Sequence, residues 1–146
     1  MLNFTWWVNR RDVDGDNIFD GGFLGLDNIG PFNRSEGLGH GRLEQADATG
    51  WMGMFALDLL DIALRLTRDR GTYEDLATKF VEHFAYISIS MDTHDLWNEK
   101  DGFYYDMFRD GDNETPIALR SMVGLIPIFA TRVVSCLLYT SDAADE

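Results

Sequence analysis

Apolar residues recur every three or four positions from Glu44 to Arg68, a spacing that places them on one face of a helix. That face contains Met52, Phe55, Ala56, Leu59, Leu60, Ala63 and Leu66. The opposite face carries the charged residues Asp58, Asp61, Arg65 and Arg68. The pattern predicts a long amphipathic helix with one side packed against other parts of the protein.

A second helix is predicted after a short connection. Gly71 is expected to end the first helix and Thr72 to cap the second, which has Glu74 and Asp75 in its first turn. Its buried face would contain Tyr73, Leu76, Ala77, Phe80, Phe84 and Ile87. Because the connection is so short, the two helices should form an antiparallel hairpin.

The remaining pattern predicts a small β-hairpin followed by a third helix. The aromatic run 103–108 is typical of a strand, 109–112 is a turn, and 116–119 is expected to pair back. The third helix should start near Arg120 or Ser121 and reach about Arg132, with Pro127 interrupting it. The apolar faces of these helices are too wide for the helices to cover one another, so we expect them to need neighbours.

Composition narrows the classes of partner. The chain of 146 residues has 25 acidic and 12 basic side chains and a formal net charge of −13. An excess of negative charge disfavours binding to nucleic acid or to an anionic membrane. The longest apolar stretch, Met122 to Ala130, is too short to span a bilayer and contains Pro127. We therefore expect no nucleic-acid partner, no membrane insertion and a cytoplasmic protein.

The last residues have a different origin from the rest of the chain. The stretch from Cys136 to Glu146 resembles the translation of a transposase adapter used for sequencing libraries. We expect residues 135–146 to be an unstructured artefact and residues 1–134 to be part of one domain. The tail has three acidic residues and no basic one, so the remainder carries a charge of −10. It also holds the single cysteine, which leaves no possible disulfide in the remainder and suits a reducing compartment.

The glycine-rich segment 21–30 contains the strongest candidate for catalysis. Asp27 stands there among glycines and large apolar residues. Glycine lets the backbone approach a ligand closely, and apolar neighbours raise a carboxyl pKa by desolvation, so that the group can act as a general acid. The alternative is a turn in which Asp27 caps the following backbone.

A second group of candidates lies at the predicted start of the first helix, in Glu44, Gln45 and Asp47. These side chains could hydrogen-bond the hydroxyl groups of a ligand, or their carboxylates could simply complement the helix dipole. Four tryptophans, including Trp51, are many for so short a chain. Most should be core residues, although the apolar face of a sugar ring commonly packs on such a side chain.

Sequence spacing predicts neither a metal site nor a cofactor. The run Asp12 to Asp16 resembles the opening of a calcium-binding loop, but Asn17 and Phe23 stand where that loop needs Gly and Glu. A polar turn explains the run better. The three histidines have no spacing typical of zinc ligands, and the glycines of 37–41 do not follow a strand as a dinucleotide site requires.

Three segments together resemble the catalytic barrel of glycoside hydrolase family 63. They are residues 3–9 with 21–35, residues 43–52, and residues 96–106 with 120–125. The resemblance implies a mainly α fold, namely a fragment of an (α/α)6 toroid with one small β-hairpin. It also implies inverting hydrolysis of α-glycosidic bonds in oligosaccharides or glycosides, without a cofactor.

The resemblance further implies roles for particular residues. Asp27 matches the general acid, and Asn28 and Arg34 would orient sugar hydroxyls. The cleft would be lined by Glu44, Gln45, Asp47 and Trp51. Inversion also needs a general base about 6.5–9.5 Å from the acid, and no counterpart of it occurs before Val134. We therefore expect the isolated chain to be inactive. The alternative function is a non-catalytic helical-hairpin module that binds a partner.

Overall fold

The computed structural model describes residues 1–20, 41–70 and 72–134. Its helices are α1 (Leu2–Arg11), α2 (Ala46–Arg70), α3 (Glu74–Thr93) and the 3₁₀ helix η1 (Met122–Phe129). Its strands are β1 (Arg42–Glu44), β2 (Trp97–Asn98), β3 (Phe103–Tyr104), β4 (Asp106–Asp110) and β5 (Asn113–Ile117).

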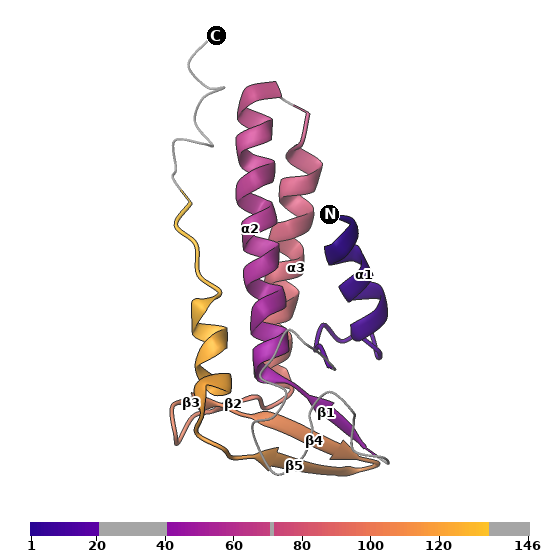
Figure 1. Ribbon diagram of the computed structural model, residues 1–146, viewed down its shortest axis with the longest axis vertical. Coiled ribbons are helices and arrows are strands. Elements are labelled where there is room, and N and C mark those ends of the chain that lie inside the picture. Colours follow the sequence, from indigo (N-terminus) through magenta and orange to yellow (C-terminus); the bar gives the residue numbers. More distant parts are fainter. Residues whose placement is uncertain (21–40, 71, 135–146) are drawn as a thin grey trace.

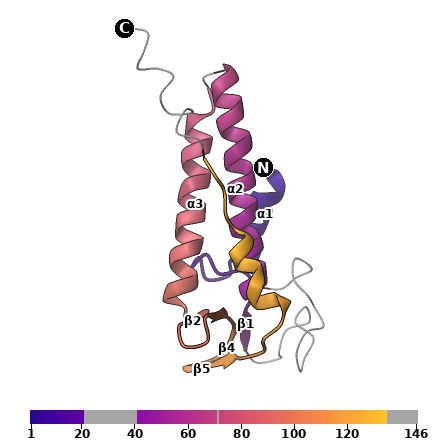
Figure 2. The same cartoon turned by 90° about the vertical axis from the view of Figure 1, so that its left-hand side faces the viewer.

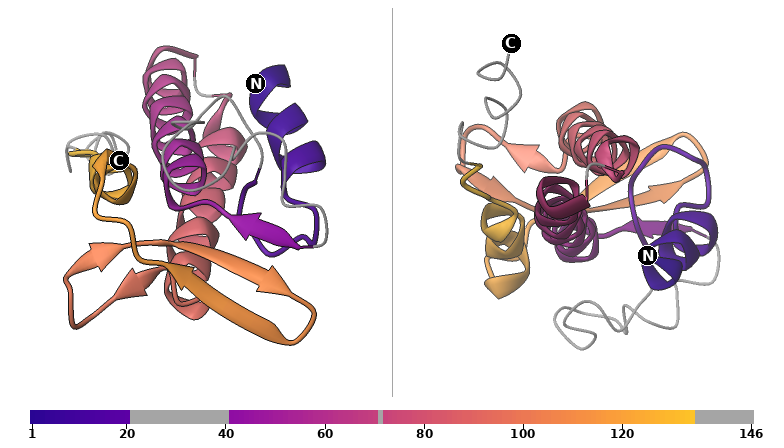
Figure 3. Two further views of the ribbon diagram at one scale, coloured as in Figure 1. Left: turned by 60° about the horizontal axis from the view of Figure 1, so that its bottom comes forward. Right: turned by 90° about the horizontal axis from the view of Figure 1, so that it is seen from above.

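The two long helices, α2 and α3, form an antiparallel hairpin at the centre of the described residues (Figure 1). Seen along the hairpin, α1 and η1 lie on opposite sides of α2 (Figure 3). The core fills the space between α1, α2 and α3, where Phe4 packs edge-on against Phe55 and Phe80. Burial of these apolar side chains is the main source of stability for such a hairpin.

A three-stranded antiparallel sheet, in the order β1-β4-β5, closes one end of the hairpin (Figure 2). Its register places Arg42 opposite Arg109 and Glu44 opposite Met107. The strands β2 and β3 form a separate two-stranded hairpin. Strand β1 ends at Glu44 and α2 begins at Ala46, so the sheet fixes the position of the start of α2.

The expectation of an (α/α)6 toroid fragment is wrong, because the described residues form a small α/β domain. They contain one antiparallel pair of long helices, flanked by the short elements α1 and η1 and closed by a sheet. Amphipathic periodicity shows that a helix face is covered but not what covers it. The sheet depends on pairing between Arg42 and Arg109, which are far apart in the sequence, and no local pattern indicates that contact.

The expectations for individual helices and strands agree better with the structure. Helix α2 is confirmed within a few residues, although Glu44 belongs to β1 and not to the helix. A hairpin is confirmed, but the predicted strand 103–108 is divided between β3, which pairs with β2, and β4, which pairs with β5. The cap of α3 is wrong: Tyr73 occupies the N-cap, and no side chain caps that end. The third helix is shorter than expected and of the 3₁₀ type, and Pro127 lies inside it near its end. The expected artefact, 135–146, lies outside the described residues.

Two glycines of α2 provide a matched test of how closely η1 packs on the long helix. A Cβ at Gly50 would lie 2.7 Å from the Cα of Pro127, whereas one at Gly53 would meet its nearest atom, in Ala130, at 3.4 Å. We expect Gly50→Ala to destabilise the fold by about 1–3 kcal/mol, because the backbone of η1 must move. Gly53→Ala should instead be neutral or stabilise it by about 0.5–1 kcal/mol through helix propensity. Urea denaturation of both variants checks this, and equal effects would contradict it.

In the part of the chain that the structure describes, no helix is both long enough and apolar enough to cross a membrane.

Candidate functional site

The structure places some of the sequence-predicted site residues and leaves others untested. Glu44, Gln45 and Asp47 are buried at the junction of β1 and α2, with exposed fractions of 1%, 1% and 0%. Trp51, one turn further along α2, is partly buried. The remaining predicted residues, Asp27, Asn28 and Arg34, lie outside the described residues.

Asp106 supplies an interaction at the start of α2 that the sequence did not reveal. Its Oδ1 accepts a hydrogen bond from the backbone N–H of Ala46 at 2.8 Å. Asp47 Oδ1 accepts one from the N–H of Ala48 at 2.9 Å. Carboxylates at a helix N-terminus satisfy its free N–H groups and complement its dipole. Two carboxylates therefore stabilise the start of α2: that of Asp47 itself and that of Asp106, which comes from the distant strand β4.

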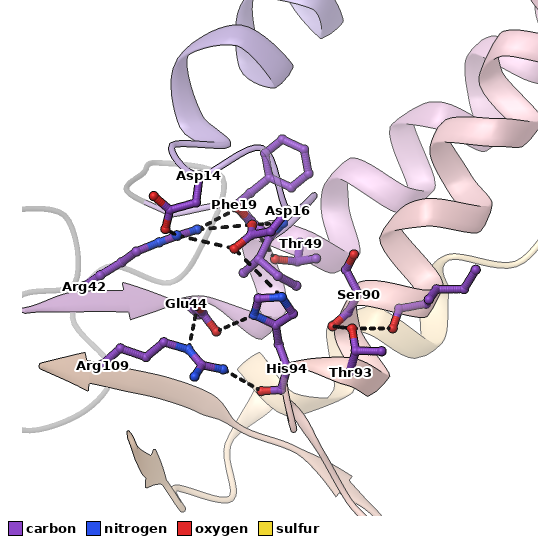
Figure 4. A network of polar contacts seen from close by, with 12 residues as sticks. Asp14, Asp16, Phe19, Arg42, Glu44, Thr49, Ser90, Thr93, His94 and Arg109 are labelled. Carbon is purple, nitrogen blue, oxygen red and sulfur yellow. Dashed lines mark hydrogen bonds and ion pairs between the residues drawn. The ribbon is translucent and has the colours of Figure 1, made fainter. Parts of the chain in front are cut away.

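Glu44 is the centre of a buried polar cluster formed with His94 and Arg109 (Figure 4). Arg109 Nε donates to Glu44 Oε1 at 2.8 Å. His94 Nδ1 lies 3.4 Å from the other oxygen, Oε2. The three residues come from β1, β4 and the segment that follows α3, so the cluster exists only in the folded chain.

The polar turn 12–17 brings further carboxylates to the same cluster. Asp16 Oδ2 lies 3.9 Å from His94 Nε2, whereas Glu44 approaches the other ring nitrogen, Nδ1. Arg42 forms an ion pair with Asp14 and a longer one with Asp16, at 3.4 Å from Nη2 to Oδ1. Arg42 Nη2 also donates to the carbonyl oxygen of Ile18 at 3.2 Å. The backbone makes this turn with positive φ at Gly15 and Asn17, 72° and 63°.

Backbone hydrogen bonds hold the cluster in place. The N–H of Phe19 donates to Thr49 Oγ1 at 3.0 Å, and the N–H of Gln45 donates to the carbonyl of Phe19 at 3.3 Å. Arg109 Nη2 donates to the carbonyl of His94 at 3.3 Å. The first two bonds tie the segment after the turn to the start of α2, and the third ties β4 to the residue after α3, so the polar side chains are preorganised.

The surroundings of the cluster are rich in negative charge. Burial raises the pKa of Asp12, and the charge of Asp16 raises it further against the backbone hydrogen bond from Asn17. Burial also raises the pKa of Asp20, although the positive charge of Arg11 opposes that rise. Burial lowers the pKa of Arg42, while the charge of Glu44 opposes the change. Burial is the largest cause of all three shifts, so the cluster lies in a poorly hydrated environment.

Two atoms at the centre of the cluster have no hydrogen-bond partner among the described residues. They are Glu44 Oε2 and His94 Nδ1, both of them buried. One ligand atom from each of Asp16, Glu44 and His94 lies within 4.8 Å of the other two. The set can therefore bind a cation. Sequence spacing did not single out His94, because its partners, Asp16 and Glu44, are far from it along the chain.

A separate pocket of about 370 Å³ lies between α2, α3 and η1. The aromatic residues Trp97 and Tyr104 line it, together with apolar side chains such as Ile87 and Met91. None of its lining residues is a carboxylate. The pocket can accept an apolar group but has no acid–base chemistry of its own.

Comparison with known proteins finds one informative similarity. No protein-family model and no solved structure matches the chain. The chain is 53% identical, over 148 aligned positions and 90% of its own length, to a Saccharomyces cerevisiae protein called Uncharacterized protein YMR196W. The chain spans 14% of the length of that relative.

Proposed function

We propose that the chain is a segment of a glycoside hydrolase of the family 63 type, which cleaves α-linked oligosaccharides or glycosides with inversion. Asp27 is the general acid and protonates the glycosidic oxygen. Asn28 and Arg34 orient sugar hydroxyls, and Gln45, Asp47 and Trp51 border the sugar. Glu44 supports this subsite from beneath, since its charge is already paired with Arg109.

The observation that carries this proposal is the position of the two ends of the segment 21–40. Before it, the carbonyl oxygen of Ile18 accepts from Arg42 Nη2 at 3.2 Å. After it, Arg42 begins the strand that leads to Glu44. The residues on either side of the segment 21–40 therefore lie next to the buried polar residues that the family resemblance assigns to the sugar subsite. Their position supports the proposal that an acid within that segment acts beside the residues at the start of α2.

The general base must come from another part of a longer protein, and the length of the yeast relative is compatible with that. An inverting enzyme needs both carboxyl groups, with a water molecule between the base and the sugar. The chain alone should therefore bind sugar weakly and hydrolyse nothing. An excess of acidic residues is no obstacle, since a neutral sugar has no charge to repel.

The test uses a full-length protein that contains this segment, with aryl α-glucosides and α-linked gluco-oligosaccharides as substrates. Proton NMR during the first turnovers should show the β-anomer of the released sugar, as inversion requires. The isolated chain, assayed in parallel, should release none. Release of the α-anomer would contradict the inverting mechanism. Failure of the full-length protein to cleave any glycoside would leave the helical-hairpin interaction module as the better interpretation.

A further inference from the structure

We propose that Asp16, Glu44 and His94 bind one divalent metal ion of the zinc class. The three side chains come from the turn after α1, from the end of β1 and from the residue after α3. An ion held by all three would link these segments beneath the start of α2. This proposal is independent of the proposed hydrolase function, because none of its steps requires the chain to bind sugar.

The first argument is the chemistry of the three groups. One ligand atom from each lies within 4.8 Å of the others, and His94 Nδ1 is 3.4 Å from Glu44 Oε2. Two ligands of a tetrahedral zinc ion stand about 3.4 Å apart, given bond lengths of about 2.1 Å. One imidazole and two carboxylates suit zinc or a similar first-row ion. Calcium is disfavoured because it takes oxygen ligands almost without exception.

The second argument is an unsatisfied atom at the centre of the set. Glu44 is 1% exposed, yet its Oε2 accepts no hydrogen bond within the part of the chain described. Its other oxygen is held by Arg109, so the carboxylate cannot turn to satisfy both atoms at once. A buried carboxylate oxygen left without a donor is costly. A cation between Glu44 and His94 would remove that cost.

The third argument is the charge balance: the two arginines of the cluster do not neutralise all of its carboxylates. Arg42 and Arg109 face the carboxylates of Asp14, Asp16, Glu44 and Glu114. His94 lies within ion-pair distance of two carboxylates, those of Asp16 and Glu44. Because Arg42 contacts Asp16 only at 3.4 Å and also holds Asp14 and the carbonyl of Ile18, it can release Asp16 to an ion. A divalent cation would offset the remaining negative charge.

The test uses the whole chain with Cys136→Ser, so that the tail thiol cannot bind the probe metals. After removal of metal by a chelator, Zn²⁺ should bind with 1:1 stoichiometry in isothermal titration calorimetry. Co²⁺ should give visible absorption bands of a protein-bound ion, and Zn²⁺ should displace them. His94→Gln and Glu44→Gln should each lower the affinity for Zn²⁺ by at least about 100-fold, because each removes a ligand.

Matched controls separate this site from adventitious binding. His83→Gln and His40→Gln remove the other two imidazoles and should leave the 1:1 binding unchanged. Asp16→Asn changes a ligand on the turn, and circular dichroism should show that it keeps the helices while its Zn²⁺ affinity falls. The proposal is overturned if the parent chain shows no 1:1 binding, or if His94→Gln binds Zn²⁺ as tightly as the parent. In that case the contacts of His94 form an ordinary ion pair. Hydrolase activity plays no part in these readouts, so they can fail or succeed independently of the proposed function.

Discussion

Asp27→Asn, made in a full-length protein that contains this segment, should lower kcat on an α-linked oligosaccharide by about 10²–10⁴-fold, the usual contribution of a general acid. Asparagine has nearly the shape of aspartate but cannot donate a proton to the leaving oxygen. KM should change little, since a loss confined to the transition state appears in kcat. Steady-state kinetics on the purified variant measure both constants.

The leaving group provides an internal control for this effect. A glycosyl fluoride or an activated aryl glycoside needs less protonation when its bond breaks, so the same variant should lose much less activity on such substrates. Asp112→Asn, in the exposed turn between β4 and β5, should leave kcat unchanged on both kinds of substrate. Near-normal activity of Asp27→Asn on the oligosaccharide would remove Asp27 from the mechanism, and an equal loss on both substrates would indicate a structural effect.

The parts of the fold that sequence could predict are those that depend on neighbours in the chain. The 3.6-residue periodicity of α2 and α3 arises from packing along one face, and it is visible in any window of a few turns. The hairpin of β4 and β5 depends on a tight turn in which Gly111 has a φ of 58°, and glycine is a strong local sign of such turns. These features need no knowledge of the rest of the molecule.

The parts that could not be predicted depend on contacts across the chain. Asp106 caps Ala46 from 60 residues away, and Arg109 reaches Glu44 from 65 residues away. The order of the sheet sets both contacts, since β1 pairs with β4 and not with its neighbour in sequence. The toroid was implied by the family resemblance, which rests on short segments and does not specify how the elements pack. Periodic apolar faces indicate that the helices need partners, and only the folded structure shows that α2 packs against α3, η1 and α1.

The same limit explains the candidate site. Glu44, Gln45 and Asp47 were singled out from their place at a predicted helix start, and the structure buries all three at the junction of β1 and α2. His94 was not singled out because its partners, Asp16 and Glu44, come from two segments far from it in the sequence. A search for ligand motifs reads spacing along the chain, whereas this cluster exists only where β1, β4, the turn after α1 and the segment after α3 meet in space.

Arg109→Ala should destabilise the fold more than any other single change to this cluster. Arg109 contacts Glu44, Glu114 and the carbonyl of His94, so its removal leaves the charge of Glu44 buried with no cation hydrogen-bonded to it. Breaking a buried ion pair from one side costs about 3–5 kcal/mol. We expect about 3 kcal/mol, at the lower end, because the Arg109 side chain retains 23% exposure and part of the interaction is with solvent. Urea denaturation at neutral pH measures the change in the free energy of unfolding.

Two further variants test whether the loss of stability comes from the carboxylate of Glu44, which stays buried without its arginine. Glu114→Gln removes the other carboxylate partner of Arg109, whose side chain is 50% exposed, and should cost about 1 kcal/mol or less as surface ion pairs do. Combining Arg109→Ala with Glu44→Gln should recover part of the stability, because the buried group that remains is then uncharged. If the double variant is as unstable as the sum of the two single variants, the cost of Arg109→Ala lies in lost packing of its side chain against the sheet and not in the charge of Glu44.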